Sequence, residues 1–164
     1  MSRHRNHAVS CAAKAPKRRF LPWLWGIAGI ALVLRLIVSL ELAAANGGRN
    51  SVNFPSQLSD LATYLRLSKE ILEGAFSGEF YYQPFYYAVF LPAVRGVFGY
   101  GPAVIFIAQS VLGALTVALA GLAAAQLWSN RAGLIAAALT AISTPLLLYT
   151  PYAKNETLQS FLLA

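Results

Sequence analysis

The sequence has little charge and only one cysteine. Only 12% of its 164 residues are charged, whereas 57% are hydrophobic, and the mean hydropathy is +0.55. An average soluble domain carries about 25% charged residues. The single cysteine has no partner in the chain, so the sequence gives no basis for a disulfide framework or a cysteine metal cluster. These shortages favour an all-α, polytopic membrane protein over a soluble domain.

Acidic residues are missing from the first twenty positions. Six basic residues lie there: Arg3, Arg5, Lys14, Lys17, Arg18 and Arg19. Basic residues beside an apolar span are retained on the cytoplasmic side, near anionic lipid. A basic tail could also bind nucleic acid, but the adjoining span favours the topological interpretation. We therefore predict a cytoplasmic tail over residues 1–20 and no nucleic-acid partner.

Three segments are long and apolar enough to cross a bilayer as helices. They cover residues 21–45, 101–128 and 132–150, and a helix needs about 20 apolar residues to span the hydrocarbon. A fourth apolar helix is predicted to begin at residue 157, and the sequence stops inside it. We therefore expect this chain to be the N-terminal part of a longer protein.

The first span has two unusual features. Ala43, Ala44 and Ala45 resemble a signal-peptide cleavage site, but the long apolar stretch and the spans that follow favour an uncleaved anchor. Arg35 lies inside the span. It is either paired with a neighbour or snorkelling towards the interface, or it faces a polar cavity.

Residues 46–100 are predicted to form an outer loop with two juxtamembrane helices. Apolar residues recur at three-and-four spacing from Leu61 onward, which predicts an amphipathic helix over 59–74 that rests its apolar side on lipid. Segment 84–98 is apolar but short and is entered through many aromatic residues, so we interpret it as juxtamembrane or re-entrant. The second and third spans then place 151–156 in an outer loop on the same side. If segment 84–98 instead crosses the membrane fully, residues 151–156 lie in the cytoplasm.

Five short stretches, in their order, carry a resemblance to a known family. They are DLATY at 60–64, SKEILEG at 68–74, YYQPFYYAVFLP at 81–92, QSVLGALTVAL at 109–119 and STPLLLYTPYAKNETLQSFLL at 143–163. Their order resembles the N-terminal part of the GT-C glycosyltransferases. The most similar branches are the glycosyltransferase 39-like proteins, which include protein O-mannosyltransferases and lipid A aminoarabinose transferases. The resemblance covers residues 20–164 and rests on order and distance, because no single motif is specific.

The resemblance implies roles for two acidic residues. An aspartate in the family's first outer loop is catalytic, and Asp60 matches it. An acidic residue in the next outer loop binds metal or the donor phosphate, and Glu156 matches that one. The implied cofactor is a divalent metal ion, Mg²⁺ or Mn²⁺, with Glu156 as its ligand. Tyr64, Arg66 and Lys154 are further candidates for contact with the donor phosphate.

The residues alone leave a plainer alternative for each position. Asp60 is equally suited to cap the helix that follows, a contribution of about 1 kcal/mol. Glu156 can cap the next helix in the same way. The chain also departs from the family pattern. Leu61 stands where many members carry a second acid, which puts the usual metal site in doubt. Gln83 stands where the residue is often basic or polar, and its uncharged amide removes a possible cation for the donor phosphate.

The expected function is therefore transfer of a sugar from a polyprenyl-phosphate-linked donor to a hydroxyl group of an acceptor protein, lipid or glycan. The reaction is expected on the outer face of a bacterial inner membrane. Residues 1–164 alone are expected to be inactive, because the family's donor cavity also needs later helices. Two other classes stay open: a transporter or flippase in which Arg35 and Asp60 line a path, and a non-catalytic component of envelope assembly.

Overall fold

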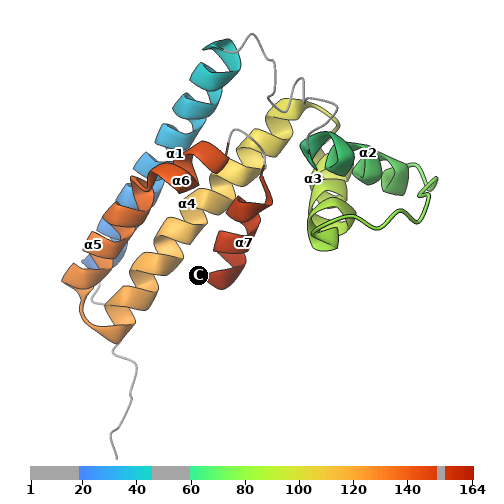
Figure 1. The fold of residues 1–164 in the computed structure, drawn as a ribbon. Coiled ribbons are helices and arrows are strands. Elements are labelled where there is room, and N and C mark those ends of the chain that lie inside the picture. The colour runs from blue at the N-terminus through green and yellow to red at the C-terminus, as the bar shows by residue number, and fades with distance from the viewer. Residues whose placement is uncertain (1–18, 46–59, 151–153) are drawn as a thin grey trace, which may run out of the picture.

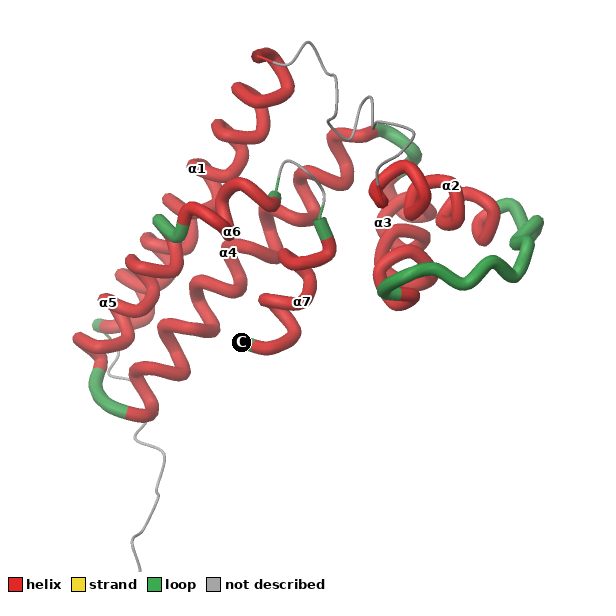
Figure 2. Tube along the Cα trace, in the orientation of Figure 1, coloured by secondary structure: helices red, strands yellow, loops and turns green. Residues whose placement is uncertain are grey.

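The computed structural model describes residues 19–45, 60–150 and 154–164, and every regular element in these ranges is a helix (Figure 2). The elements form two groups (Figure 1). A helical bundle contains α1, α4 and α5, with the short helices α6 and α7 against it. A smaller group of α2, a π-helical turn and α3 lies beside the N-terminal end of α4. The predicted tail falls almost entirely outside the described residues, as does most of the predicted loop 151–156.

The two longest helices of the bundle are α1 (Phe20–Ala45) and α4 (Pro102–Leu127). Both contain a segment long and apolar enough to cross a membrane, Phe20–Glu41 in α1 and Ala103–Leu127 in α4. Ala103–Leu127 lies within the predicted span 101–128, and Phe20–Glu41 begins one residue before the predicted span 21–45 and ends inside it. Neither helix has acidic residues in its first turn or basic residues in its last turn, so apolar length rather than charge defines them.

Glycines allow the bundle helices to approach closely. A Cβ on Gly121 of α4 would lie 2.5 Å from Cδ1 of Leu24 in α1. A Cβ on Gly133 of α5 (Asn130–Ala141) would lie 2.6 Å from the carbonyl oxygen of Gly121. Backbone can meet backbone at this crossing because neither residue carries a side chain, as is common where helices pack in membranes.

The third predicted span, 132–150, is divided in the structure. Helix α5 ends at Ala141, and α6 (Thr144–Tyr149) begins after a two-residue break. Ser143 is extended, with φ −60° and ψ 110°. Pro145 has no N–H to donate to the carbonyl group of Ala141, so it cannot continue the hydrogen-bonding pattern of α5. At 12 and 6 residues, neither helix alone reaches the length that a crossing needs.

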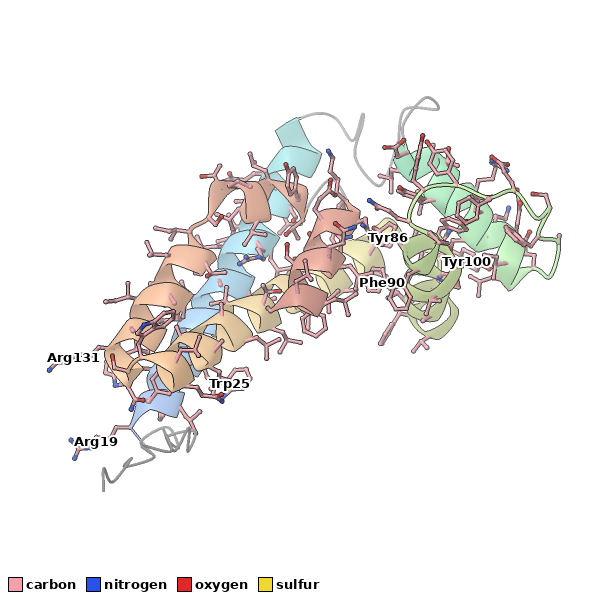
Figure 3. The ribbon with its side chains drawn as sticks, turned by 60° about the horizontal axis from the view of Figure 1, so that its bottom comes forward. Arg19, Trp25, Tyr86, Phe90, Tyr100 and Arg131 are labelled. Carbon is pink, nitrogen blue, oxygen red and sulfur yellow. The ribbon has the colours of Figure 1, made fainter. Side chains whose placement is uncertain are left out.

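Charge and aromatic side chains gather at one end of the bundle. Figure 3 shows Arg19, Trp25 and Arg131 at the same end, where α1 begins and the α4–α5 turn lies. Arg19 and Arg131 are exposed, and so are the rings of Trp25 and Trp128. Tryptophan rings are enriched at both interfaces between a membrane and water. The smaller group of helices lies at the opposite end.

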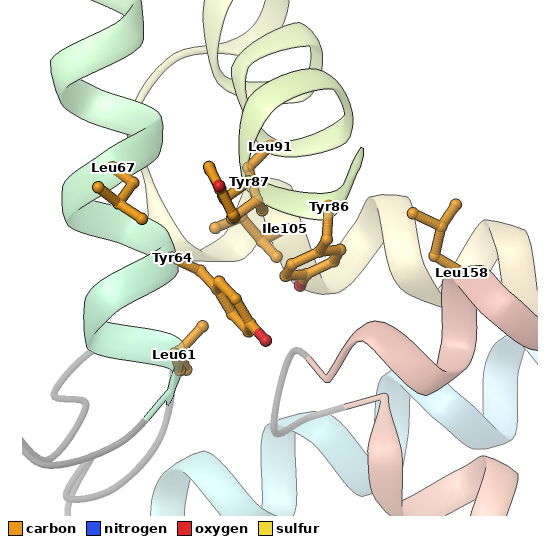
Figure 4. Close-up of a cluster of buried hydrophobic side chains, with 8 residues drawn as sticks. All are labelled: Leu61, Tyr64, Leu67, Tyr86, Tyr87, Leu91, Ile105 and Leu158. Carbon is orange, nitrogen blue, oxygen red and sulfur yellow. The ribbon is translucent and has the colours of Figure 1, made fainter. Parts of the chain in front are cut away.

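The smaller group packs around a hydrophobic core to which α4 and α7 also contribute. Helix α2 (Asp60–Leu72) packs on the π-helical turn η1 (Tyr86–Phe90) and on α3 (Leu91–Phe98). The core contains eight buried side chains: Leu61, Tyr64, Leu67, Tyr86, Tyr87, Leu91, Ile105 and Leu158 (Figure 4). The apolar side of α2 therefore rests on other helices, and the expectation that it rests on lipid was wrong. Periodicity identified the buried face of α2, but it did not identify what covers that face.

The turn at Tyr86–Phe90 determines which aromatic rings enter this core. Its hydrogen bonds join residues five apart, as in the bond from the N–H of Leu91 to the carbonyl of Tyr86. Such turns insert one extra residue into a helix and are often found at functional sites. Tyr86 and Tyr87 are neighbours in sequence, yet both are buried, with 0% and 2% of their surface exposed.

Candidate functional site

Asp60 is the first residue of α2, and its carboxylate is exposed. The hydroxyl group of Tyr81 donates a hydrogen bond of 2.7 Å to Oδ1 of Asp60. Tyr81 belongs to the loop before η1, so this bond joins the start of α2 to that loop. A helix N-terminus also favours negative charge, because its first N–H groups point towards it.

Tyr64 lies one turn after Asp60 and forms the centre of a tyrosine cluster. Its ring centroid lies 5.6 Å from that of Tyr81 and 5.3 Å from that of Tyr86, both edge to face. It also stacks on Tyr87 at 6.1 Å. Such pairs contribute about 0.5–1.5 kcal/mol each beyond the area that they bury. The cluster holds the Tyr64 ring in a single place.

The two predicted acidic residues both influence the pKa of Tyr64. Burial is the largest influence and raises the pKa of Tyr64 to about 12, with further contributions from Asp60, Tyr81 and Glu156. Burial also raises the pKa of Tyr86, and Glu156 again contributes. The carboxylates of Asp60 and Glu156 therefore both contribute to the raised pKa of Tyr64, although they lie 96 positions apart in the sequence.

Glu156 lies in the first turn of α7 (Asn155–Leu163), whose start is held by a buried glutamine. The side-chain amide of Gln109 in α4 donates 2.8 Å to the hydroxyl of Tyr86 and 3.1 Å to the backbone carbonyl of Lys154. Gln109 is fully buried. These two bonds fix the N-terminus of α7, and with it Glu156, relative to the tyrosine cluster.

The basic candidates lie in different surroundings. Arg66 is exposed and forms ion pairs with Glu70 at 2.9 Å and Glu79 at 2.7 Å. Its hydrogen bond lowers the pKa of Glu70. These ion pairs hold Arg66 on the charged side of α2, so Arg66 is not part of the candidate site. The ammonium group of Lys154 lies 5.2 Å from the ring centroid of Tyr149, and the side chain is exposed, one residue before α7 begins.

Arg95 holds α3 against α2. Its Nη1 donates 2.9 Å to the carbonyl of Leu65 and 3.4 Å to the hydroxyl of Ser68. Its guanidinium also lies over the ring of Tyr100, at 4.7 Å from the centroid. With 9% of its surface exposed, Arg95 joins the two helices and is not available to a phosphate.

The described residues contain no group of three or more histidine, cysteine, aspartate or glutamate side chains placed to hold a metal ion. The site does contain two carboxylates near one cluster of rings. Mg²⁺ is often bound through one or two carboxylates, with substrate phosphates and water completing its shell. Within the described residues, Asp60 and Glu156 would therefore hold such an ion only together with a phosphate substrate and water.

Comparison with protein-family models, with curated proteins and with solved structures found no match for this chain.

Two participants were not predicted as site residues. Tyr81 was grouped with the aromatic anchors of the interface, yet it donates a hydrogen bond to Asp60. Gln109 lies within the predicted span 101–128. An amide in the interior of such a span is itself a signal, because a polar side chain in hydrocarbon needs a partner. That reasoning could have identified Gln109 from the sequence.

Proposed function

We propose that this chain is the N-terminal part of a polytopic membrane glycosyltransferase of GT-C type. It uses a sugar linked to polyprenyl phosphate and transfers it to an acceptor hydroxyl on the outer face of the membrane. The observation that carries the proposal is that the tyrosine cluster is linked to the starts of both α2 and α7: Tyr81 donates to Asp60, and Gln109 joins Tyr86 to the Lys154 backbone beside the start of α7. The resemblance assigns catalytic and phosphate-binding roles to the carboxylates of Asp60 and Glu156.

The arrangement of charge supports this orientation. Arg19 and Arg131 lie at one end of the bundle, together with Trp25 (Figure 3). That end is cytoplasmic by the positive-inside rule, in the inner membrane of a bacterium. The group that contains Asp60 lies at the other end (Figure 1). The candidate site then lies at the outer surface, where a lipid-linked donor and an external acceptor can meet.

Asp60 acts as general base in this mechanism. Its carboxylate accepts the proton of the acceptor hydroxyl while the hydroxyl oxygen forms a bond to the anomeric carbon. The bond between that carbon and the phosphate oxygen breaks, and its electron pair leaves with the polyprenyl phosphate. Tyr81 donates to Oδ1, and a carboxylate can accept further bonds on both oxygens. Tyr81 thus orients Asp60 and leaves Oδ2 for the acceptor. General-base catalysis contributes roughly 10²- to 10⁴-fold in rate.

The leaving phosphate needs positive charge beside it. Lys154 is the basic residue nearest in sequence to Glu156, and its exposed ammonium can approach a phosphate. A divalent ion held by Glu156 and the donor phosphate would supply the same stabilisation as a Lewis acid. Gln109 supports either arrangement, because it fixes the backbone from which both Lys154 and Glu156 project.

Asp60→Asn in the full-length protein tests the proposal. Membranes containing the variant are supplied with a radiolabelled polyprenyl-phosphate sugar, and transfer to endogenous acceptor is counted. Transfer is expected to fall by roughly 10²-fold or more, with insertion unchanged. Glu73→Gln is the matched control, because Glu73 is an exposed carboxylate in the turn directly after the same helix, paired at 3.7 Å with Lys69. Wild-type transfer by Asp60→Asn would overturn the general-base role.

A transporter is the second candidate, and Arg35 favours it. Arg35 is fully buried between α1 and α4 and donates from Nη1 to the carbonyl of Ala31 at 3.2 Å. Within the described residues, its Nε and Nη2 atoms have no hydrogen-bond partner. Buried charge in a membrane span often marks a transport path. For a transporter, Asp60→Asn would leave sugar-donor consumption unchanged and would alter the flux of a solute.

A further inference from the structure

A groove, called here the α3–α4 groove, lies between α4 and the helical segment formed by η1 and α3. Phe90 and Phe98 form one wall, and Ile107 and Val111 of α4 form part of the other. Its volume is about 350 Å³, and all of its lining side chains are apolar. Phe90 also stacks on Tyr86 at 5.5 Å, so the groove and the cluster share a wall.

The α4 wall of the groove is continuous with the surface that α4 presents to its surroundings. Ile107 is 54% exposed and Val111 is 41% exposed. Both lie within the segment of α4 that is long and apolar enough to cross a membrane. If α4 spans the bilayer, this face meets hydrocarbon, and the groove opens into the hydrocarbon as well.

The α3 wall also presents apolar side chains outward. Val97 and Phe98 expose 73% and 70% of their surface, and Tyr100 exposes 52%. The exposed charged residues of this group lie instead on α2 and directly after it, where Arg66 pairs with Glu70 and Lys69 with Glu73. Arg95 of α3 is buried, so the exposed surface of the group is amphipathic, charged along α2 and apolar along α3.

We propose that the α3–α4 groove binds one hydrocarbon chain of a phospholipid in the outer leaflet of the membrane. The inference rests on the membrane placement proposed above, but not on glycosyl transfer. An apolar groove of this volume that opens into hydrocarbon is filled by hydrocarbon, because leaving it empty forfeits dispersion contacts on every wall. The bound chain holds α3 in the leaflet and thereby supports the tyrosine cluster through Phe90.

Depth measurement tests the position of α3. Phe98→Cys is made with Cys11, the one cysteine of the chain, replaced by serine, and is labelled with bimane in phosphatidylcholine and phosphatidylglycerol vesicles. Brominated acyl chains are expected to quench this label strongly, and aqueous iodide weakly. Lys69→Cys on α2 is the control, with the opposite pattern expected. Iodide quenching at position 98 equal to that at position 69 would overturn the proposal.

Lipid retention tests the groove itself. Ala108 lines it, so Ala108→Phe fills it, whereas Ala123→Phe adds the same ring at an exposed position of α4 outside it. Phospholipid that remains after detergent extraction is counted by native mass spectrometry. Ala108→Phe is expected to lower retention roughly tenfold relative to Ala123→Phe, since a buried chain loses its apolar contact.

Equal phospholipid retention by the two variants would contradict the groove as a lipid site. Retention of polyprenyl phosphate in place of phospholipid, or a dimer that excludes both, would assign the groove to another occupant and overturn the proposal as stated. Circular dichroism of both variants reports whether they fold. Sugar transfer is not measured in either experiment, so the failure of this inference and the failure of the proposed function are separable.

Discussion

Gln109 connects to Lys154 across the bundle: its amide donates 3.1 Å to the Lys154 carbonyl while also donating 2.8 Å to Tyr86. One side chain thus joins α4, the π-helical turn and the start of α7. A buried hydrogen bond contributes about 0.5–1.5 kcal/mol net, and leaving a buried polar group unpaired costs more. The candidate site therefore depends on a residue that does not belong to either predicted outer loop.

Gln109→Leu is expected to loosen the start of α7. The variant keeps the side-chain volume but removes both hydrogen bonds, which should destabilise the fold by about 1–3 kcal/mol. Hydrogen exchange at the first turn of α7 should become faster. Gln126→Leu is the matched control, because Gln126 is exposed on the same helix. Unchanged exchange in Gln109→Leu would show that α7 is held by other contacts.

The raised pKa of Tyr64 predicts that the folded protein loses stability at high pH. Its pKa is about 12 in the folded protein, compared with about 10 in an unfolded chain. The neutral phenol is therefore favoured by folding, so its contribution is complete below about pH 10 and is lost as the pH rises towards about 12. Thermal unfolding of detergent-solubilised protein should show Tm falling across this range.

Tyr64→Phe should reduce that fall in Tm, because the ring stays and the titrating group goes. Tyr149→Phe serves as the control, since Tyr149 lies on α6, outside the tyrosine cluster. If Tyr64→Phe and Tyr149→Phe show the same dependence on pH, the burial of the Tyr64 hydroxyl is not its cause.

Gly113→Ala is expected to strain the α1–α4 contact. A Cβ at this position would clash with Nε of Arg35 and approach its Cδ at 2.9 Å. Arg35 is fully buried, so the displacement should cost about 1–3 kcal/mol. Gly29→Ala is the control, because no atom lies within 4 Å of its added Cβ. In a double-mutant cycle, Arg35→Ala should remove most of the cost of Gly113→Ala, and strict additivity would contradict the contact.

Arg66 and Lys154 should respond differently to removal. Arg66→Ala breaks two exposed ion pairs, a change worth about 0–1 kcal/mol each, and should leave sugar transfer near the wild-type rate. Lys154→Ala should lower transfer and raise the KM for the lipid-linked donor, because it removes charge from the phosphate. A larger loss of sugar transfer in Arg66→Ala than in Lys154→Ala would show that Arg66 belongs to the site.

The sequence allowed the long helices to be predicted, because their apolar runs define them. Helix α1 differs from its predicted range 21–45 by one residue at its start, and α4 differs from 101–128 by one residue at each end. The break before Pro145 was missed because apolar residues continue through it. The prediction followed the apolar composition and did not take account of the N–H that proline lacks. The pairing of α2 with η1 was missed for a different reason. Periodicity defines an apolar face, but lipid and protein cover such a face equally well.

The candidate site was predictable only in part. Asp60 and Glu156 were selected through the resemblance, and both carboxylates contribute to the raised pKa of Tyr64. Arg66 was selected as a cation near the site, but local pairing with Glu70 at i,i+4 holds it elsewhere. The bond between Tyr81 and Asp60 joins residues 21 apart across a loop. Sequence spacing does not encode such a contact, because the path of the loop depends on the whole core beneath it.

The π-helical turn at Tyr86–Phe90 makes the length of this segment as important as its composition. A turn of this kind is an α-helix with one residue added, and each residue rotates a helix by about 100°. Deleting a single residue there, even an alanine such as Ala88, would restore regular α-helix and rotate α3 relative to η1. Arg95 would then turn away from α2, and the walls of the groove would separate. Homologous chains that keep this site should therefore conserve the number of residues between Tyr81 and Arg95, whatever side chains they carry in between.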